Sequence, residues 1–408
     1  MNVVSALQTY NAQREPERLQ MKYRNMRSDP FVFLRGSCHL FYRQLPQRGI
    51  FKSAPPVWSC GDLHLENFGS YKGDNRLPYF DVNDFDEAVL APASWDTVRM
   101  LTSLRVGAKT LGIASGESDT LCRTFLTAYA DALKQGKAGW LEPQTAHGLI
   151  RSLLDGLRDR NRKAFLDGRS KLKGKRRRLI ADGKKALPAT NEQREKVERF
   201  MASFAKSQAH PAFYKVLDLA RRIAGTGSLG VERYVVLVEG KGSPDGNYLL
   251  DLKETLPSSL AAVVKIKQPK WTSEAERVVE LQRRIQAVSM AFLHPVTLGD
   301  KSYVLRGLQP TEDRVALSRA EHSFAAIERT VADMGRMVAW GPLRSSGRQG
   351  SATADELIDF ARGAKWRDKL LRASEDFAVR TVKDWEVFAS AFDAGAFGPA
   401  PAADSIRR

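Results

Sequence analysis

The stretch Cys60–Gly69, with the sequence CGDLHLENFG, constrains this chain more than any other. It holds Asp62 and Asn67 five residues apart, with glycine close to each end. A second acidic stretch, Phe80–Glu87 (FDVNDFDE), follows shortly afterwards and contains Asp84. A carboxylate such as Asp62 can accept or orient a proton, and the oxygens of Asn67 and Asp84 are of the kind that a hard cation prefers. The alternative interpretation is a pair of polar turns whose side chains cap backbone groups.

Length and composition favour a globular protein of two or three lobes, because the chain has 408 residues, 43% apolar and 27% charged. We expect no signal peptide, since no basic segment followed by an apolar run opens the chain. We also expect no membrane span, because no apolar stretch approaches about 18 residues. The three cysteines, Cys38, Cys60 and Cys122, form no CxxC pair and indicate reduced thiols in a cytoplasmic protein.

The net charge of +17 is concentrated in one segment. Residues 158–185 contain 13 Lys or Arg and three Asp, a local balance of +10, which leaves +7 for the remainder of the chain. We interpret this segment as a solvated helix face and loop, and docking of an acidic partner is the alternative. Its only aromatic residue is Phe165, so a base-stacking surface for nucleic acid is not expected.

Periodicity and turn residues predict the order of the elements. Short strands are expected at 57–60, 68–71, 77–82, 231–238, 248–253 and 302–306. Helices are expected at 1–28, 96–111, 116–135, 143–166, 191–222, 273–292, 319–343, 354–371 and 373–394, and the helix at 191–222 is expected to be interrupted near His210-Pro211. The strands 68–71 and 77–82 surround KGDN and predict a hairpin, which would fold Asp84 back towards Asn67. Arg35 either contacts an anion or pairs with a nearby carboxylate, and we favour the pairing.

A glycine-rich run, Gly225–Gly230 (GTGSLG), opens the β-rich part of the chain. A dinucleotide-binding GxGxxG would follow a strand and open a helix, whereas this run precedes a strand. A glycine loop before a strand, with Lys253 on the next strand, is the arrangement that covers nucleotide phosphates in kinases. A plain hairpin turn with a surface lysine explains the run equally well when it is considered alone.

Together these motifs resemble a known group of enzymes. GDLHLENFG resembles the GDxHxxN catalytic loop of aminoglycoside and choline phosphotransferases, NDFDEA resembles their metal-binding segment, and Trp95-Asp96 resembles a helix-start aspartate that follows it. The ordered set DPFVFLRG, CGDLHLENFG, FDVNDFDEA, SWDTVR, GTGSLG, LKE, ERVVELQRRIQ and YVLRGLQ resembles a bacterial domain-of-unknown-function family, number 2252. The resemblance covers residues 29–310 well and the C-terminal part weakly.

The resemblance implies an α+β, two-lobed, kinase-like fold that uses ATP and magnesium. It implies that Asp62 is the catalytic base, supported by His64, and that Asn67 and Asp84 are the metal ligands. Asp81 and Asp86 are the alternatives for the metal aspartate. The nucleotide-binding residues that it implies are Gly225, Gly227, Ser228, Gly230 and Lys253, an adenine hinge within Tyr303–Leu308 that includes Val304 and Arg306, and Glu276, preferred to Glu280, as the partner of Lys253.

The order of these motifs departs from that of ordinary kinases, because the glycine loop and Lys253 follow the catalytic loop. This order predicts a circular permutation with a helical catalytic lobe at 1–222, a β-rich nucleotide lobe at 223–310 and completing helices at 311–408. Met337–Trp340 also departs from the related pattern, which leaves the acceptor side of the site open.

The function that we expect is transfer of phosphate from ATP to a hydroxyl group, on a small molecule in preference to a protein. Nucleotidyl transfer to a protein is an alternative within the same fold. A nucleotide-binding regulatory module without turnover and a basic nucleic-acid-binding protein are alternatives from other classes.

Overall fold

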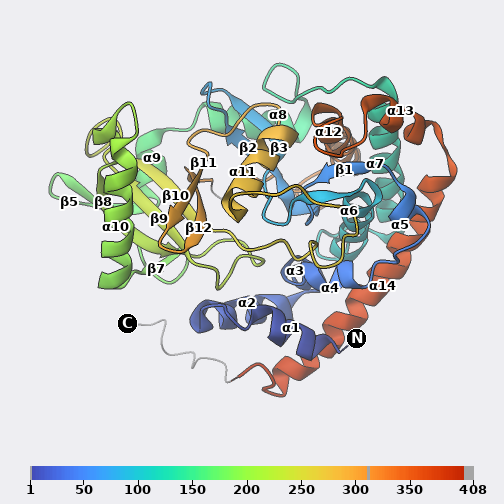
Figure 1. Ribbon diagram of the computed structural model, residues 1–408, viewed down its shortest axis with the longest axis horizontal. Coiled ribbons are helices and arrows are strands. Elements are labelled where there is room, and N and C mark those ends of the chain that lie inside the picture. The colour runs from blue at the N-terminus through green and yellow to red at the C-terminus, as the bar shows by residue number, and fades with distance from the viewer. Residues whose placement is uncertain (1, 310–312, 399–408) are drawn as a thin grey trace.

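The computed structural model describes residues 2–309 and 313–398, which form a mixed α+β fold (Figure 1). The α-helices of these residues are α1 (Val3–Asn11), α2 (Pro16–Ser28), α3 (Pro30–Gly36), α4 (Cys38–Arg43), α5 (Ile50–Ser53), α6 (Ser94–Gly107), α7 (Ser115–Gln135), α8 (Gly148–Arg158), α9 (Arg162–Asp167), α10 (Asn191–Lys206), α11 (Glu274–Ile285), α12 (Phe324–Arg344), α13 (Ala354–Arg362) and α14 (Lys365–Asp393). The strands are β1 (Pro56–Ser59), β2 (Phe68–Lys72), β3 (Pro78–Val82), β4 (Val89–Pro92), β5 (Ser170–Lys173), β6 (Arg176–Leu179), β7 (Ala186–Pro188), β8 (Val216–Arg222), β9 (Arg233–Val238), β10 (Tyr248–Glu254), β11 (His294–Leu298) and β12 (Lys301–Gly307). Short 3-10 helices lie at η1 (Leu65–Asn67) and η2 (Pro211–Tyr214).

The largest sheet has six strands in the order β11-β12-β10-β9-β8-β7, and every neighbouring pair is antiparallel. After Arg233, strand β9 is apolar, and both of its faces are covered. Tyr234, Val236 and Val238 pack in one cluster with α10, while Val235 and Leu237 pack in another on the opposite face. Figure 1 shows α10 standing along this sheet, at the opposite side of the molecule from α13 and α14.

The other part of the molecule is a helical body built around α6, which is buried on nearly every side. The short β1–β4 pair and the β2–β3 hairpin pack into the same core. Since β1 ends at Ser59 and β2 begins at Phe68, this packing holds the Cys60–Asn67 segment against α6. The predicted hairpin is thereby confirmed, with Phe68 opposite Val82.

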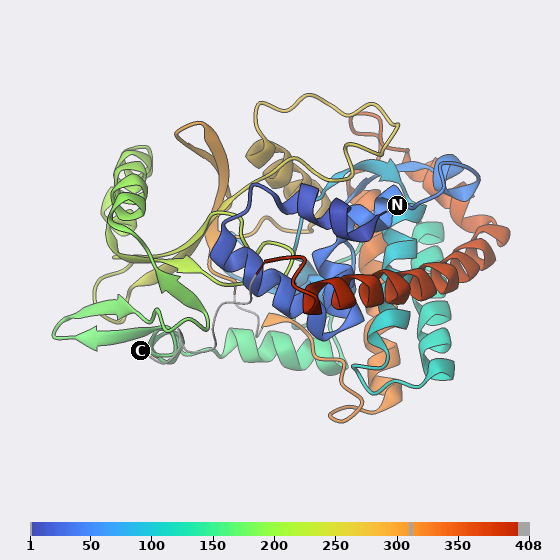
Figure 2. The same cartoon turned by 90° about the horizontal axis from the view of Figure 1, so that it is seen from below.

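Helices α1 and α2 lie beside the C-terminal helix α14 (Figure 2). Their contact is an apolar cluster that includes Leu7, Met26 and Phe388. The break between α2 and α3 falls where Asp29-Pro30 predicts it, and the Asp29 carboxylate caps α3 by accepting from Phe31 N at 2.7 Å.

The prediction of helix over 191–222 is wrong at its end, because residues 216–222 form β8. The 3-10 turn η2 interrupts the helix, and Val216–Arg222 then pairs with β9. Pairing within a sheet outweighs local helix propensity here. The glycine run is therefore the loop between two adjacent antiparallel strands, and the sheet starts before residue 223.

Other predicted helices have different bounds. The 143–166 segment is divided into α8 and α9, with Asn161 capping α9, and the final helices divide at Gly363-Ala364. Helix α11 ends at Ile285, and the edge strand β11 that follows was missed because Pro295 weakens its strand signal. The basic segment 158–185 contains the expected helix as α9, but the β5–β6 hairpin stands where a loop was expected.

Two further expectations concern boundaries and membranes. The boundary expected between residues 310 and 311 lies outside the described residues. Within residues 2–309 and 313–398, no helix combines the length and the apolar character that crossing a membrane requires.

Candidate functional site

The segment that carries Asp62 is held by the first turn of α6. The Asp96 carboxylate accepts hydrogen bonds from Cys60 N at 2.8 Å and from Gly61 N at 3.0 Å. Gly61 has a φ of +84°, and a Cβ at this position would collide with the backbone carbonyl of Glu87. Glycine is therefore required, and Asp96 fixes the backbone immediately before Asp62.

Asp62 forms an ion pair with Arg99, a fully buried residue of α6. Both Arg99 Nε, at 2.7 Å, and Arg99 Nη2 bind the same oxygen, Oδ1. Burial raises the pKa of Asp62 to about 6, although Arg99 opposes the shift. The carboxylate is therefore ionised at neutral pH, and a proton binds it more tightly than it binds an ordinary aspartate. These are the properties of a general base.

Asn67 and His64 are fixed by short-range bonds. Asn67 Nδ2 donates to the Asp62 carbonyl at 2.9 Å, which directs the amide oxygen away from this bond. His64 Nδ1 accepts from Glu66 N at 3.1 Å, and burial, followed by the charges of Arg35 and Arg99, lowers the pKa of the imidazole well below its ordinary value. His64 is therefore neutral and supports the turn.

Asp84 and Asp86 follow β3, and both lie near Lys253, which belongs to β10 of the large sheet. Lys253 Nζ forms an ion pair with the Asp86 carboxylate. Burial favours a raised pKa for Asp84, but the charges of Lys253 and Arg306 outweigh it and lower that pKa. Asp84, whose side chain is exposed to solvent, is thus a carboxylate that stays charged.

The expected pairing of Lys253 with Glu276 is wrong. The Glu276 carboxylate instead accepts from Thr272 N at 2.5 Å and from Thr272 Oγ1 at 2.7 Å at the start of α11. Glu280 pairs with Arg283 at 3.0 Å. Glu276 and Glu280 are therefore bound within α11 or just before it, and Lys253 takes its partner from the segment after β3.

Two adjoining cavities meet between the helical body and the sheet. The first contains Tyr10, Arg14, Lys22 and Asp86, and the second contains His64, Asn67, Lys253 and Arg306. Both cavities are lined by Arg35, Asp62, Asp84, Gly227 and Ser228. Gly225 lines the second cavity, whereas Gly230 lines neither and shapes the end of the loop with a φ of +86°. Residues far apart in sequence therefore surround one polar space.

The second cavity also holds an arginine cluster that the sequence did not reveal. Fully buried Asp251 on β10 forms ion pairs with Arg222 at 2.9 Å, Arg233 at 2.6 Å and Arg306 at 3.4 Å. The three arginines line the cavity and share this carboxylate, so positive charge remains in excess. The signal was Asp251 within the apolar run YLLDL, since an acid buried among apolar residues needs cationic partners.

Val304 is poorly placed for an adenine hinge. It lies opposite Lys253 of β10 on one side and Pro295 of β11 on the other, and its side chain is 4% exposed. A strand between two neighbours uses its backbone groups in the sheet. Of the expected hinge residues, Arg306 lines the second cavity and Val304 does not.

Asp81 is also separated from the site, because it is buried and pairs with Arg344 at 3.1 Å. The described residues include no group of three or more His, Cys, Asp or Glu that could hold a metal ion. Asp84 and Asn67 nevertheless fit magnesium, which takes few protein ligands and completes its coordination with phosphate and water oxygens. Arg35 forms the expected ion pair, with Glu66 at 2.7 Å.

The fold and the cavities define a mixed α+β protein in which a helical body and an antiparallel sheet enclose a site rich in both carboxylates and buried cations. The family model described as "Uncharacterized protein conserved in bacteria (DUF2252)" matches residues 14–391, so the chain belongs to this family. Neither the curated proteins nor the solved structures contain a match to the chain.

Proposed function

We propose that this protein is an ATP- and magnesium-dependent phosphotransferase with a circularly permuted, kinase-like architecture, acting on a hydroxyl acceptor. The observation that carries the proposal is the second cavity, where Asp62, Asn67 and Asp84 meet the glycine loop and Lys253. A metal-binding pair, a base, a flexible backbone loop and a lysine are the parts that phosphoryl transfer uses.

The order of elements in the sheet supports a kinase-like nucleotide lobe. The glycine loop joins β8 to β9, Lys253 lies on β10, and α11 follows β10. In kinases the glycine loop likewise covers the phosphates, with the lysine on the third strand of the lobe and a helix after it. The packing of α1 and α2 on α14 supports permutation, because termini that lie near each other allow a chain to be reconnected.

In the proposed reaction, Asp62 accepts the proton of the acceptor hydroxyl while the hydroxyl oxygen forms a bond to the terminal phosphorus of ATP. The bond from that phosphorus to the bridging oxygen breaks, and ADP leaves. Asn67 and Asp84 would hold magnesium, which neutralises phosphate charge when bound. Lys253 and Arg306 add positive charge on the same side, and residues 225–228 present backbone to the phosphates.

The test compares Asp84→Asn and Asp62→Asn with Asp74→Asn, a control in the exposed turn of the β2–β3 hairpin. ATP with magnesium is expected to raise the Tm of the wild-type protein and of Asp74→Asn. Asp84→Asn should lose the magnesium-dependent part of this shift. Binding at a hundred times Kd stabilises a protein by about 2.7 kcal/mol, which corresponds to a shift of a few degrees.

Asp62→Asn should keep the shift and lower ATP turnover about 10²–10⁴-fold, the usual contribution of a general base. Mass spectrometry of the product then distinguishes added phosphate from added nucleotide. A wild-type protein whose Tm is insensitive to ATP and magnesium would refute the proposal.

A further inference from the structure

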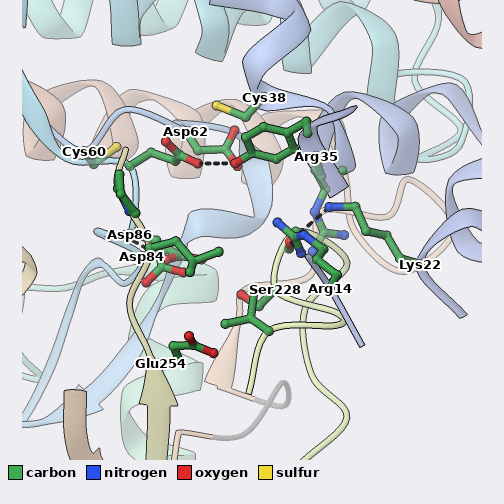
Figure 3. Close-up of a pocket in the computed structure, with 17 residues that line it drawn as sticks. Arg14, Lys22, Arg35, Cys38, Cys60, Asp62, Asp84, Asp86, Ser228 and Glu254 are labelled. Atoms are coloured by element: carbon green, nitrogen blue, oxygen red, sulfur yellow. Dashed lines mark hydrogen bonds between the residues drawn. The ribbon is translucent and has the colours of Figure 1, made fainter. Parts of the chain in front are cut away.

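The first cavity has two chemically different sides (Figure 3). Figure 3 shows carboxylates along one side, those of Asp62, Asp84, Asp86 and Glu254. On the other side lie three cations, Arg14, Lys22 and Arg35. The proposed function uses the acidic side, which leaves the cationic side without a role.

Lys22 is the least compensated of these cations. It is 1% exposed, and its Nζ donates to the Gly227 carbonyl at 3.1 Å. No carboxylate of the described residues forms an ion pair with it. Burial, followed by the charge of Arg14, lowers the pKa of Lys22 well below its ordinary value. An ammonium group has three donors, and burying its charge without a counter-ion is costly.

Arg14 is close to Lys22 because both donate to one oxygen. Arg14 Nη1 binds the carbonyls of Gly227 at 2.6 Å and Leu229 at 2.7 Å. Its Nε is buried without a hydrogen-bond partner among the described residues, and so is the Nε of Arg35. Like charges this close repel each other, so the arrangement favours the arrival of an anion.

The carboxylates of the neighbourhood are occupied elsewhere. Asp62 pairs with Arg99, and Asp86 pairs with Lys253. Glu254 pairs with Lys301 at 3.1 Å, and Glu87 accepts from Ser259 N at 2.6 Å.

Arg35 has Glu66 as its partner, but Glu66 also binds Arg314 at 2.7 Å, so one carboxylate serves two arginines. Fixing the glycine loop explains hydrogen bonds to carbonyls but not a cluster of one buried cation, Lys22, and two half-buried cations, Arg14 and Arg35, because neutral donors would make the same bonds.

We propose that Arg14, Lys22 and Arg35 bind an anionic group, phosphate or carboxylate, of the acceptor molecule. The anionic group itself follows from the cation cluster, and its assignment to the acceptor rests on the proposed function. Arg14 and Lys22 line the first cavity only, whereas Lys253 and Arg306 line the second, where the nucleotide phosphates are placed. Asp62 lies at the junction of the two cavities, so an acceptor held by its anionic end presents a hydroxyl to the base. The acceptor class is thereby narrowed to a hydroxyl compound that carries phosphate or carboxylate.

The test measures binding of inorganic phosphate while the nucleotide site is filled with a non-hydrolysable ATP analogue and magnesium. The variant is Lys22→Met, which keeps most of the length of the side chain and removes its charge. The matched control is Lys52→Met, at an exposed lysine of α5. Ionic strength is kept constant with chloride. Thermal shift and calorimetry report the apparent Kd for phosphate.

Phosphate is expected to stabilise the wild-type protein and Lys52→Met, and Lys22→Met should bind it at least tenfold more weakly. Without phosphate, the Tm of Lys22→Met should equal or exceed that of wild type, because a buried unpaired charge has been removed. A retained shift with the ATP analogue shows that this variant is folded.

Equal phosphate binding by Lys22→Met and wild type, or no binding by wild type, would overturn the proposal. Phosphate binding that occurs with ADP but is abolished by the ATP analogue would assign the cations to the terminal phosphate of the nucleotide and overturn the acceptor assignment. Failure of the proposed function can be distinguished from failure of the anion site, because ATP and magnesium would then not raise the Tm of the wild-type protein. Lys22-dependent phosphate binding in nucleotide-free protein supports the anion site in that case as well.

Discussion

Replacing Asp96 by alanine is expected to destabilise the protein strongly, because Asp96 joins α6 to the segment that carries Asp62. The substitution leaves the buried N–H of Cys60 without its acceptor, and it leaves the N–H of Gly61 with only the hydroxyl of Ser59, at 3.2 Å. An unsatisfied buried donor costs about 1–3 kcal/mol. The one donor left unsatisfied, Cys60 N, predicts a loss of about 1–3 kcal/mol, a substantial part of the stability of an ordinary domain.

The assay is equilibrium unfolding in urea, followed by far-UV circular dichroism. The control is Asp119→Ala, because the Asp119 carboxylate is 48% exposed and pairs with Arg105 near the surface. An exposed ion pair contributes about 0–1 kcal/mol, so this variant should unfold close to wild type. Equal m values in all three proteins show that the same unfolding reaction is compared.

Hydrogen exchange of the peptide around Cys60 and Gly61 supplies a local measurement. Asp96→Ala should exchange these amides faster under native conditions, whereas Asp119→Ala should not change them. Unfolding midpoints and exchange rates of Asp96→Ala that match those of Asp119→Ala would refute the assignment of Asp96 as the anchor of this segment.

Two further predictions follow from buried charges. Asp251→Asn should lower the free energy of unfolding by about 3–5 kcal/mol, since three arginines lose their shared counter-ion. A change under 1 kcal/mol in urea unfolding would contradict that role. ATP turnover should fall as the pH drops through about 6, because Asp62 then binds a proton and ceases to act as a base. Arg99→Met should move this acidic limb to higher pH, because the guanidinium that favours the charged carboxylate is absent, and an unmoved limb would argue against Asp62 as the base.

Local sequence determined the elements whose signals lie within a few residues. The KGDN turn between two apolar runs specified the β2–β3 hairpin, and Asp29-Pro30 specified the boundary between α2 and α3. The motif CGDLHLENFG placed Asp62 and Asn67 in one turn, because bonds such as Asn67 Nδ2 to the Asp62 carbonyl join neighbours in the chain.

Tertiary structure decided the features that depend on distant partners. Residues 216–222 form a strand because they pair with β9. Local propensity does not include such pairing with a distant segment. Lys253 pairs with Asp86 instead of Glu276, because Glu276 accepts hydrogen bonds from Thr272, just before its own helix. The cationic side of the first cavity forms only where the N-terminal helices pack next to the glycine loop. No sequence motif therefore identified Lys22. Short-range hydrogen bonds join residues that are close in sequence, so local sequence predicts them. The charge balance of a buried cavity depends on residues from distant segments, which only the tertiary fold brings together.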